Sequence, residues 1–225
     1  MNNQAAARIV YWTYCSNSNL AKAVNLVCSA RAAGVLDAIY VVIDSEYSGG
    51  SVMGAELVYI SGIELLDEGA RLIVCLKTAF SNMREEYLVY LDPELSFLFN
   101  PDLLSAIVGC GSVLFLKEYF SNEETMPAEH IYYLLFRKFR ICSTTLIPRE
   151  PRIWVVRGKA VDAVFSVTQE IFTELASVGA PKSWRLVAFL IDFLFTAGLV
   201  NTATQQTLLE GFNCTVVFNR YSYDS

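Results

Sequence analysis

The amino-acid sequence predicts one α/β domain with a mostly parallel central sheet flanked by helices, whose N-terminal half is Rossmann-like. Three observations predict it. The first 45 residues have the strand–helix–strand pattern of a parallel βαβ unit. Residues 87–91, "YLVYL", form a continuously apolar stretch, which is typical of a parallel strand buried on both faces. No linker, fixed-period repeat or low-complexity tract divides the 225 residues.

The βαβ unit begins with residues 8–14, "RIVYWTY", a β-branched and aromatic run of strand length. The turn that follows, "CSNSN", holds Ser and Asn residues that favour a turn and a helix cap. Residues 20–34 repeat apolar side chains at helical spacing, and Gly34 can end that helix. Residues 37–44, "DAIYVVID", form a second buried strand.

The same alternation of strands and helices continues through the chain. Further strands are predicted at residues 55–60, 87–92, 112–116, 152–156 and 214–218. Further helices are predicted at residues 75–83, 101–107, 129–140, 159–175 and 184–200.

The composition limits the classes of protein to consider. Hydrophobic residues make up 54% and charged residues 18%, which suits a large buried core, and a net charge of −6 argues against a nucleic-acid partner. No secretory signal opens the chain, and the longest apolar run, residues 186–200, is shorter than the ~20 residues that span a bilayer. The six cysteines include no CxxC or CxxH, so we expect buried thiols and a cytoplasmic protein.

Polar side chains follow several of the predicted strands. Residues 14–17 follow the first strand, Asp44 ends the second, and Asp92 and Glu94 end the central one. Ligands of open α/β sheets bind beyond the carboxyl ends of the strands, so these residues are expected at one binding edge. Two carboxylates on one turn can hold a divalent cation that in turn holds phosphate oxygens. The alternative is that the pair caps the next element and faces water.

The segment "YLVYLDPELSFLFNPDLL", residues 87–104, resembles the metal-site segment of GT-A glycosyltransferases, especially the glycogenin-like group that uses nucleotide sugars. That group has an apolar strand ending in D-x-D, an apolar stretch and then N-x-D-x-L. Here Asp92-Pro93-Glu94 stands at the D-x-D, and Asn100 and Asp102 fall in step. The first βαβ unit is similar to that of the family, and "LLEGFN" (208–213) resembles its "LP..FN" segment.

The resemblance implies one glycosyltransferase-like domain over residues 1–225, with a nucleotide-sugar half at about 8–110 and an acceptor half at about 111–225. It implies that Asp92 and Glu94 bind Mn²⁺ or Mg²⁺, and that a UDP-sugar is the donor. The residues expected to contact the nucleotide or its phosphates are Thr13, Tyr14, Ser16, Asn17, Asp44 and Lys77. Leu20 stands where the family often has a base-stacking Tyr.

Asp192 interrupts the apolar run at residues 186–200, where an unpaired carboxylate is costly to bury. Its position is near that of the family's D-Q carboxylate beside the sugar, so it is the candidate catalytic residue; a helix cap or a distant salt bridge is the alternative. His130 is expected to be a packed or partly exposed side chain rather than a ligand. The basic end at residues 137–140 could attract a diphosphate or an acidic acceptor, or simply be a solvated helix end.

The preferred hypothesis is therefore a metal-dependent glycosyltransferase that acts on an unidentified glycan or protein acceptor; the resemblance implies retention of anomeric configuration. A second hypothesis is a catalytically inactive GT-A-like binding or scaffolding domain, because the sequence has no counterpart of the family's N-S-G or of its closing H-F-x-G-x-x-K-P-W. A nucleotidyltransferase ranks last, since "CSNSN" has neither glycine nor a basic residue to hold phosphates. A homo-oligomer is left open.

Overall fold

The computed structural model describes residues 8–15, 19–43, 51–59, 70, 73–74, 77, 80, 83, 86–108, 113–116, 152–177 and 210–212. The strands within these residues are β1 (Arg8–Cys15), β2 (Ala38–Ile43), β3 (Glu56–Tyr59), β4 (Glu86–Leu91), β5 (Val113–Leu116) and β6 (Ile153–Arg157). The helices within them are α1 (Leu20–Ala32), α3 (Leu103–Ile107), the 3-10 turn η3 (Gly158–Ala160) and α5 (Val161–Ser177).

These strands form one sheet in the order β3-β2-β1-β4-β6-β5. β1 lies at its centre, parallel to β2 on one side and to β4 on the other, so that Tyr11 is aligned with both Ile39 and Val89. β6 runs antiparallel to both β4 and β5. The prediction of a mostly parallel sheet is confirmed, with β6 as the strand that runs the other way.

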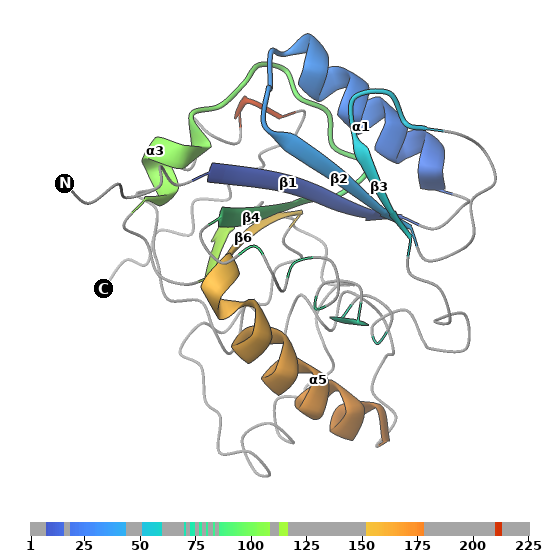
Figure 1. Cartoon of the computed structure of the whole chain (residues 1–225), viewed down its shortest axis with the longest axis vertical. Helices are drawn as coiled ribbons and strands as arrows, with labels where there is room; N and C mark the ends of the chain where they lie inside the picture. The colour runs from blue at the N-terminus through green and yellow to red at the C-terminus, as the bar shows by residue number, and fades with distance from the viewer. Residues whose placement is uncertain are drawn as a thin grey trace, which may run out of the picture.

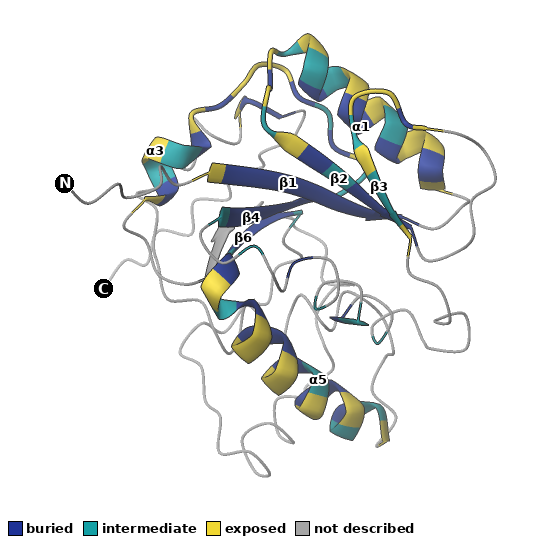
Figure 2. Cartoon of the chain, in the orientation of Figure 1, coloured by how far each residue is buried: buried dark blue, intermediate teal, exposed yellow. Residues whose placement is uncertain are grey.

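Helices cover the sheet on both faces, with α1 on one face and α5 on the other (Figure 1). α1 turns Ala23, Val27 and Ala30 towards the sheet, where all three are fully buried, and the exposed residues of the helix lie on its outer side (Figure 2). The apolar spacing of residues 20–34 therefore marks the face that packs on the sheet, as expected of an amphipathic helix.

The opposite face of the sheet is an aromatic layer. The ring of Trp12 lies 4.7 Å from that of Tyr90, 5.3 Å from that of Trp154 and 5.4 Å from that of Phe80. Phe165 of α5 lies 6.3 Å from Trp154 and continues the layer onto the helix. Tilted and edge-on rings at these separations pack favourably, so this layer fixes α5 on the sheet.

The predicted elements correspond closely to the observed ones. The strand and helix limits of the βαβ unit differ by one or two residues from the expected ones. Residues 70, 73, 74, 77 and 80 are helical and Met83 is not, so helical residues lie both before and within the helix expected at 75–83. The helix expected from residue 159 is preceded by the turn η3. The elements expected at 129–140, 184–200 and 214–218 lie outside the described residues.

The expectation of buried thiols is confirmed for Cys15 and wrong for Cys28, which is exposed; neither forms a disulfide. Cys28 follows the buried Val27 in α1, and a step of one residue turns the side chain about 100° around the helix axis, away from the sheet. No helix in the described residues is long and apolar enough to cross a membrane.

Candidate functional site

Asp92 stands directly after β4, and backbone contacts fix its position. Its N–H donates to the carbonyl of Arg152 at 2.8 Å, which extends the β4–β6 pairing by one residue. Pro93 has no N–H, so the next amide is that of Glu94, which donates to Asp92 Oδ1 at 2.8 Å. The N–H of Leu95 donates to the carbonyl of Asp92 at 3.0 Å and closes a turn. The D-P-E sequence thus builds a turn that points both acidic residues beyond the strand end.

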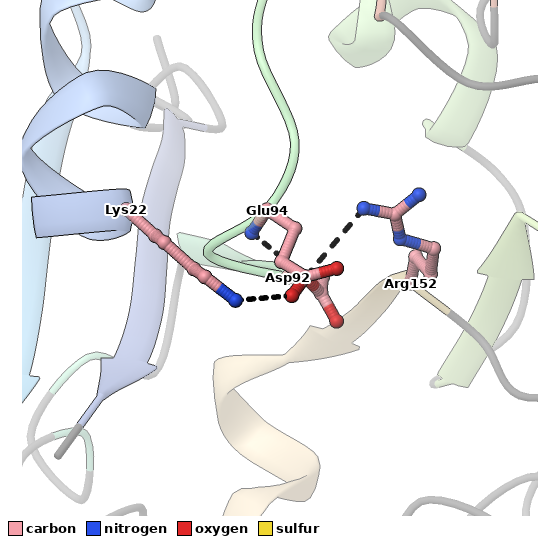
Figure 3. Close-up of polar contacts among 4 residues, drawn as sticks. All are labelled: Lys22, Asp92, Glu94 and Arg152. Carbon is pink, nitrogen blue, oxygen red and sulfur yellow. Dashed lines mark hydrogen bonds and ion pairs between the residues drawn. The ribbon is translucent and has the colours of Figure 1, made fainter. Parts of the chain in front are cut away.

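Each of the two carboxylates has a cationic neighbour. Arg152 Nη2 lies 3.7 Å from Asp92 Oδ1, and the ammonium group of Lys22, in the first turn of α1, forms an ion pair with Glu94 Oε1. The two cations approach the carboxylates from opposite sides (Figure 3). The Asp92 and Arg152 side chains are 14% and 17% exposed, whereas Glu94 and Lys22 are 58% and 49% exposed. The site therefore combines a mostly buried ion pair with an exposed one.

The electrostatic surroundings of Asp92 leave its negative charge incompletely stabilised. Burial is the largest influence and raises the pKa of Asp92 above the usual value of 3.8. The N–H of Glu94 and the guanidinium of Arg152 lower that pKa only in part, and the charge of Glu94 raises it further. An additional cation close to Asp92 would stabilise the ionised form, which is the form that binds metals.

The chemistry of this turn fits an oxygen-bound divalent cation such as Mg²⁺ or Mn²⁺. Asp92 and Glu94 offer carboxylate oxygens, the ligands that these ions prefer. The described part of the chain contains no group of three or more His, Cys, Asp or Glu side chains placed to hold a metal. Among the described residues, a cation bound here would thus take two protein ligands and complete its coordination with water or phosphate oxygens.

The other predicted contact residues are placed as follows. Thr13 is completely buried in β1, and its Oγ1 makes no hydrogen bond; Tyr14 next to it is buried as well. The ammonium of Lys77 donates to Ser166 Oγ of α5 at 3.2 Å. Nucleotide contacts by these residues stay predictions. The predicted site residues that lie outside the described part are Ser16, Asn17, Asp44 and Asp192, and the same is true of His130.

The N-x-D residues lie at the other end of the segment. Asp102 caps α3, its Oδ1 accepting the N–H of Ser105 at 3.2 Å. Asn100 and Asp102 line a cavity of about 350 Å³ together with Arg8 and Tyr11, at the amino end of β1. This cavity lies at the sheet edge opposite the Asp92–Glu94 turn, because β1 and β4 are parallel and Arg8 is aligned with Glu86 at the start of β4.

Sequence reasoning missed Lys22 and Arg152 as members of the site. The sequence did contain a signal for Lys22. A cation in the first turn of a helix is unfavourable beside the helix dipole, so its presence there indicates another role. The βαβ connection also places that turn at the carboxyl edge of the sheet, where ligands bind. Arg152 begins the strand predicted at residues 152–156, which by itself does not place it beside Asp92. Its proximity to Asp92 depends on the antiparallel register that aligns Leu91 with Ile153.

No protein-family model matches the sequence, and no curated protein matches it. Solved structures resemble it in fold. One is the apo structure of WbbM, a bifunctional glycosyltransferase, with a TM-score of 0.59 at 12% identity, covering 97% of this chain and 47% of that chain. Another is the galactosyltransferase LgtC in complex with donor and acceptor sugar analogues, with a TM-score of 0.56 at 10% identity, covering 85% of this chain and 72% of that chain.

The present chain thus spans about half the length of the WbbM chain. Identities this low show the fold and leave the reaction to the site itself. The chain has the fold of GT-A glycosyltransferases.

Proposed function

We propose that the chain is a metal-dependent glycosyltransferase that moves a sugar from a nucleoside-diphosphate sugar, with a UDP-sugar as the favoured donor, to an unidentified glycan or protein acceptor. One observation carries the proposal. Asp92 and Glu94 stand on a backbone-fixed turn at the carboxyl end of β4, beside the first turn of α1, in a chain with the GT-A fold. In open α/β sheets this edge is where ligands bind.

The chemistry follows from these positions. Transfer breaks the bond between the anomeric carbon and a diphosphate oxygen, and the diphosphate leaves with the electron pair of that bond. A new bond forms from the anomeric carbon to an acceptor oxygen, whose proton passes to the departing diphosphate or to water. A divalent cation, when bound, offsets the charge that grows on the departing diphosphate. In this chain Asp92 and Glu94 would hold that cation, and the N–H of Glu94 would orient Asp92 Oδ1.

The finer assignments belong to the same proposal. Residues that would contact the nucleoside or its phosphates are Thr13, Tyr14, Ser16, Asn17, Asp44 and Lys77. Asp192 would face the transferred sugar. The resemblance to the glycogenin-like group favours retention of the anomeric configuration of the sugar. NMR of the product would establish that configuration. A cytoplasmic location is supported by Cys15 and Cys28, which form no disulfide.

Calorimetric titration with UDP, GDP and their sugars, with and without Mn²⁺, tests the proposal on wild type and Asp92→Ala. A matched control is Asp162→Ala, an exposed acidic residue in the first turn of α5. α5 follows β6, which runs opposite to β4, so Asp162 lies near the other edge of the sheet. We expect binding that requires Mn²⁺, is lost in Asp92→Ala and is kept in Asp162→Ala. Folded wild-type protein that binds no nucleotide under any metal condition would refute the proposal.

The second candidate is a binding or scaffolding domain without catalysis. The observation in its favour is that Lys22 and Arg152 already lie against Glu94 and Asp92, a charge arrangement that balances without a metal. On that reading Asp92→Ala would change the thermal stability of the protein, and the wild type would give no nucleotide-binding heat. The same titrations therefore separate the two candidates.

A further inference from the structure

We propose that Lys22 and Arg152 are diphosphate-binding residues that exchange partners: they lie against Glu94 and Asp92 in the metal-free protein and turn to the donor diphosphate once a divalent cation occupies the carboxylates. The inference rests on the proposed function and deepens it. It assigns a role to two cations that the sequence did not identify as site residues, and it makes metal and donor binding depend on one another.

The charges of the site favour such an exchange. Among the described side chains at this turn, the two carboxylates and the two cations that face them carry charges that sum to zero. A divalent cation bound to Asp92 and Glu94 would offset the charges of those carboxylates and add two positive charges to this group of four side chains. The diphosphate of a nucleotide sugar is doubly negative at neutral pH and would restore neutrality. Without these cations the metal-loaded carboxylates would already be neutral and would attract the diphosphate less.

The geometry of Lys22 permits the exchange. Its side chain and that of Glu94 are 49% and 58% exposed, and exposed ion pairs contribute little to stability, so this pair can be replaced at small cost. Lys22 also lies in the first turn of α1, which contains no acidic residue, and the side chain of Asn19 makes no capping hydrogen bond there. The backbone amides of that turn and the ammonium of Lys22 therefore both favour an anion.

The geometry of Arg152 also permits the exchange. Its Nη2 lies 3.7 Å from Asp92 Oδ1, longer than a charge-assisted hydrogen bond. The same Asp92 oxygen accepts the N–H of Glu94, so the turn keeps its shape if the guanidinium moves. A guanidinium has five N–H donors and suits phosphate oxygens. Because Arg152 and Lys22 reach the turn from opposite sides, a diphosphate above the carboxylates would meet one cation on each side (Figure 3).

The test measures two affinities of the full chain by calorimetry: that of Mn²⁺ alone, and that of UDP at saturating Mn²⁺. Lys22→Gln is the deciding variant, because Lys22 is exposed and its loss leaves no buried charge behind. We expect Lys22→Gln to bind Mn²⁺ alone up to about fivefold more tightly, since a competitor for Glu94 is gone. We expect the same variant to bind UDP about tenfold more weakly, since a phosphate contact is gone.

Two further variants sharpen the result. Lys159→Gln is the matched control, an exposed lysine in η3 after β6, near the other edge of the sheet, and should leave both affinities unchanged. Arg152→Lys keeps the charge and loses the fork of donors, so it should weaken UDP binding with little change in Mn²⁺ affinity. The melting curve of Arg152→Lys shows whether that variant is folded. The result for Lys22→Gln does not depend on it.

Opposite shifts of the two affinities in Lys22→Gln support the exchange, because a merely structural ion pair would not tighten metal binding and weaken nucleotide binding together. Unchanged affinities, or affinities that both fall, in a wild type that binds Mn²⁺ and UDP would overturn the exchange and leave the glycosyltransferase proposal intact. A wild type that binds neither would overturn both.

Discussion

Replacing Asp92 by Asn is expected to stabilise the free protein while it abolishes metal-dependent nucleotide binding. Only 14% of the Asp92 side chain is exposed, and burial raises its pKa despite the nearby guanidinium of Arg152. A raised pKa means that folding favours the neutral acid, so the ionised carboxylate costs free energy at neutral pH. Asn has almost the same shape, carries no charge, and its amide oxygen can still accept the N–H of Glu94.

The expected gain follows from that cost. Stabilising substitutions, including those that optimise charges, commonly contribute about 0.5–2 kcal/mol each, and we expect Asp92→Asn to fall in this range. For a chain of this size, each kcal/mol raises the melting temperature by about 2–4 °C. Thermal unfolding followed by circular dichroism at pH 7 should therefore show Asp92→Asn melting about 1–8 °C above the wild type.

The matched control is Asp102→Asn, for which the sign is reversed. Asp102 is exposed and caps α3, and its hydrogen bonds to Ser105 lower its pKa, so the ionised form stabilises the fold. Asp102→Asn should melt below the wild type.

The two effects also differ in their pH dependence. The advantage of Asp92→Asn is complete above the raised pKa of Asp92 and disappears as the pH falls through that pKa towards 3.8. The contribution of Asp102 is complete above 3.8 and is lost as the pH falls through its lowered pKa. An Asp92→Asn protein that melts at or below the wild-type temperature at pH 7 would show that Arg152 and the Glu94 amide compensate the buried charge in full.

Three other substitutions test the packing that supports the site. Phe212 is 1% exposed, and its ring lies 4.6 Å from that of Phe97. Phe212→Ala should lower the free energy of unfolding by about 3–5 kcal/mol and the melting temperature by about 6–20 °C. A fall of only a degree or two would contradict this contact. Thr13→Val removes a buried hydroxyl that makes no hydrogen bond and should raise the free energy of unfolding in urea by about 1 kcal/mol, whereas a loss would show that the hydroxyl has a partner. Arg31 donates to the carbonyl of Gly54 at 2.9 and 2.6 Å, so Arg31→Lys should lower the free energy of unfolding by about 1–3 kcal/mol, and an unchanged urea midpoint would argue against that anchor.

Local patterns predicted much of the fold. β1 is buried at every position after Arg8, and β4 at every position after Glu86. A β-branched and aromatic run was enough to recognise β1, and a continuously apolar run was enough to recognise β4. α1 was recognisable because its apolar residues recur on one face. The burial of Cys28 was predicted wrongly, since residue type and an absent export signal do not reveal on which side of a helix a residue lies.

Half of the candidate site could be predicted in the same way. Asp92 and Glu94 are separated by one residue and follow a recognisable strand, so their proximity is a local property. The antiparallel β6 that brings Arg152 against Asp92 could not be predicted, because strand order and register depend on contacts among distant segments. The catalytic assignment of Asp192 stays a prediction.

The sequence by itself determined the α/β class, the first βαβ unit and the acidic turn after the central strand, since each depends on residues near one another in the chain. Only the tertiary structure decided that the carboxylates of this turn lie against cations. Lys22 and Glu94 are 72 residues apart, and no periodicity connects them. Their meeting is a consequence of parallel pairing, which places the first turn of α1 and the end of β4 at the same edge of the sheet.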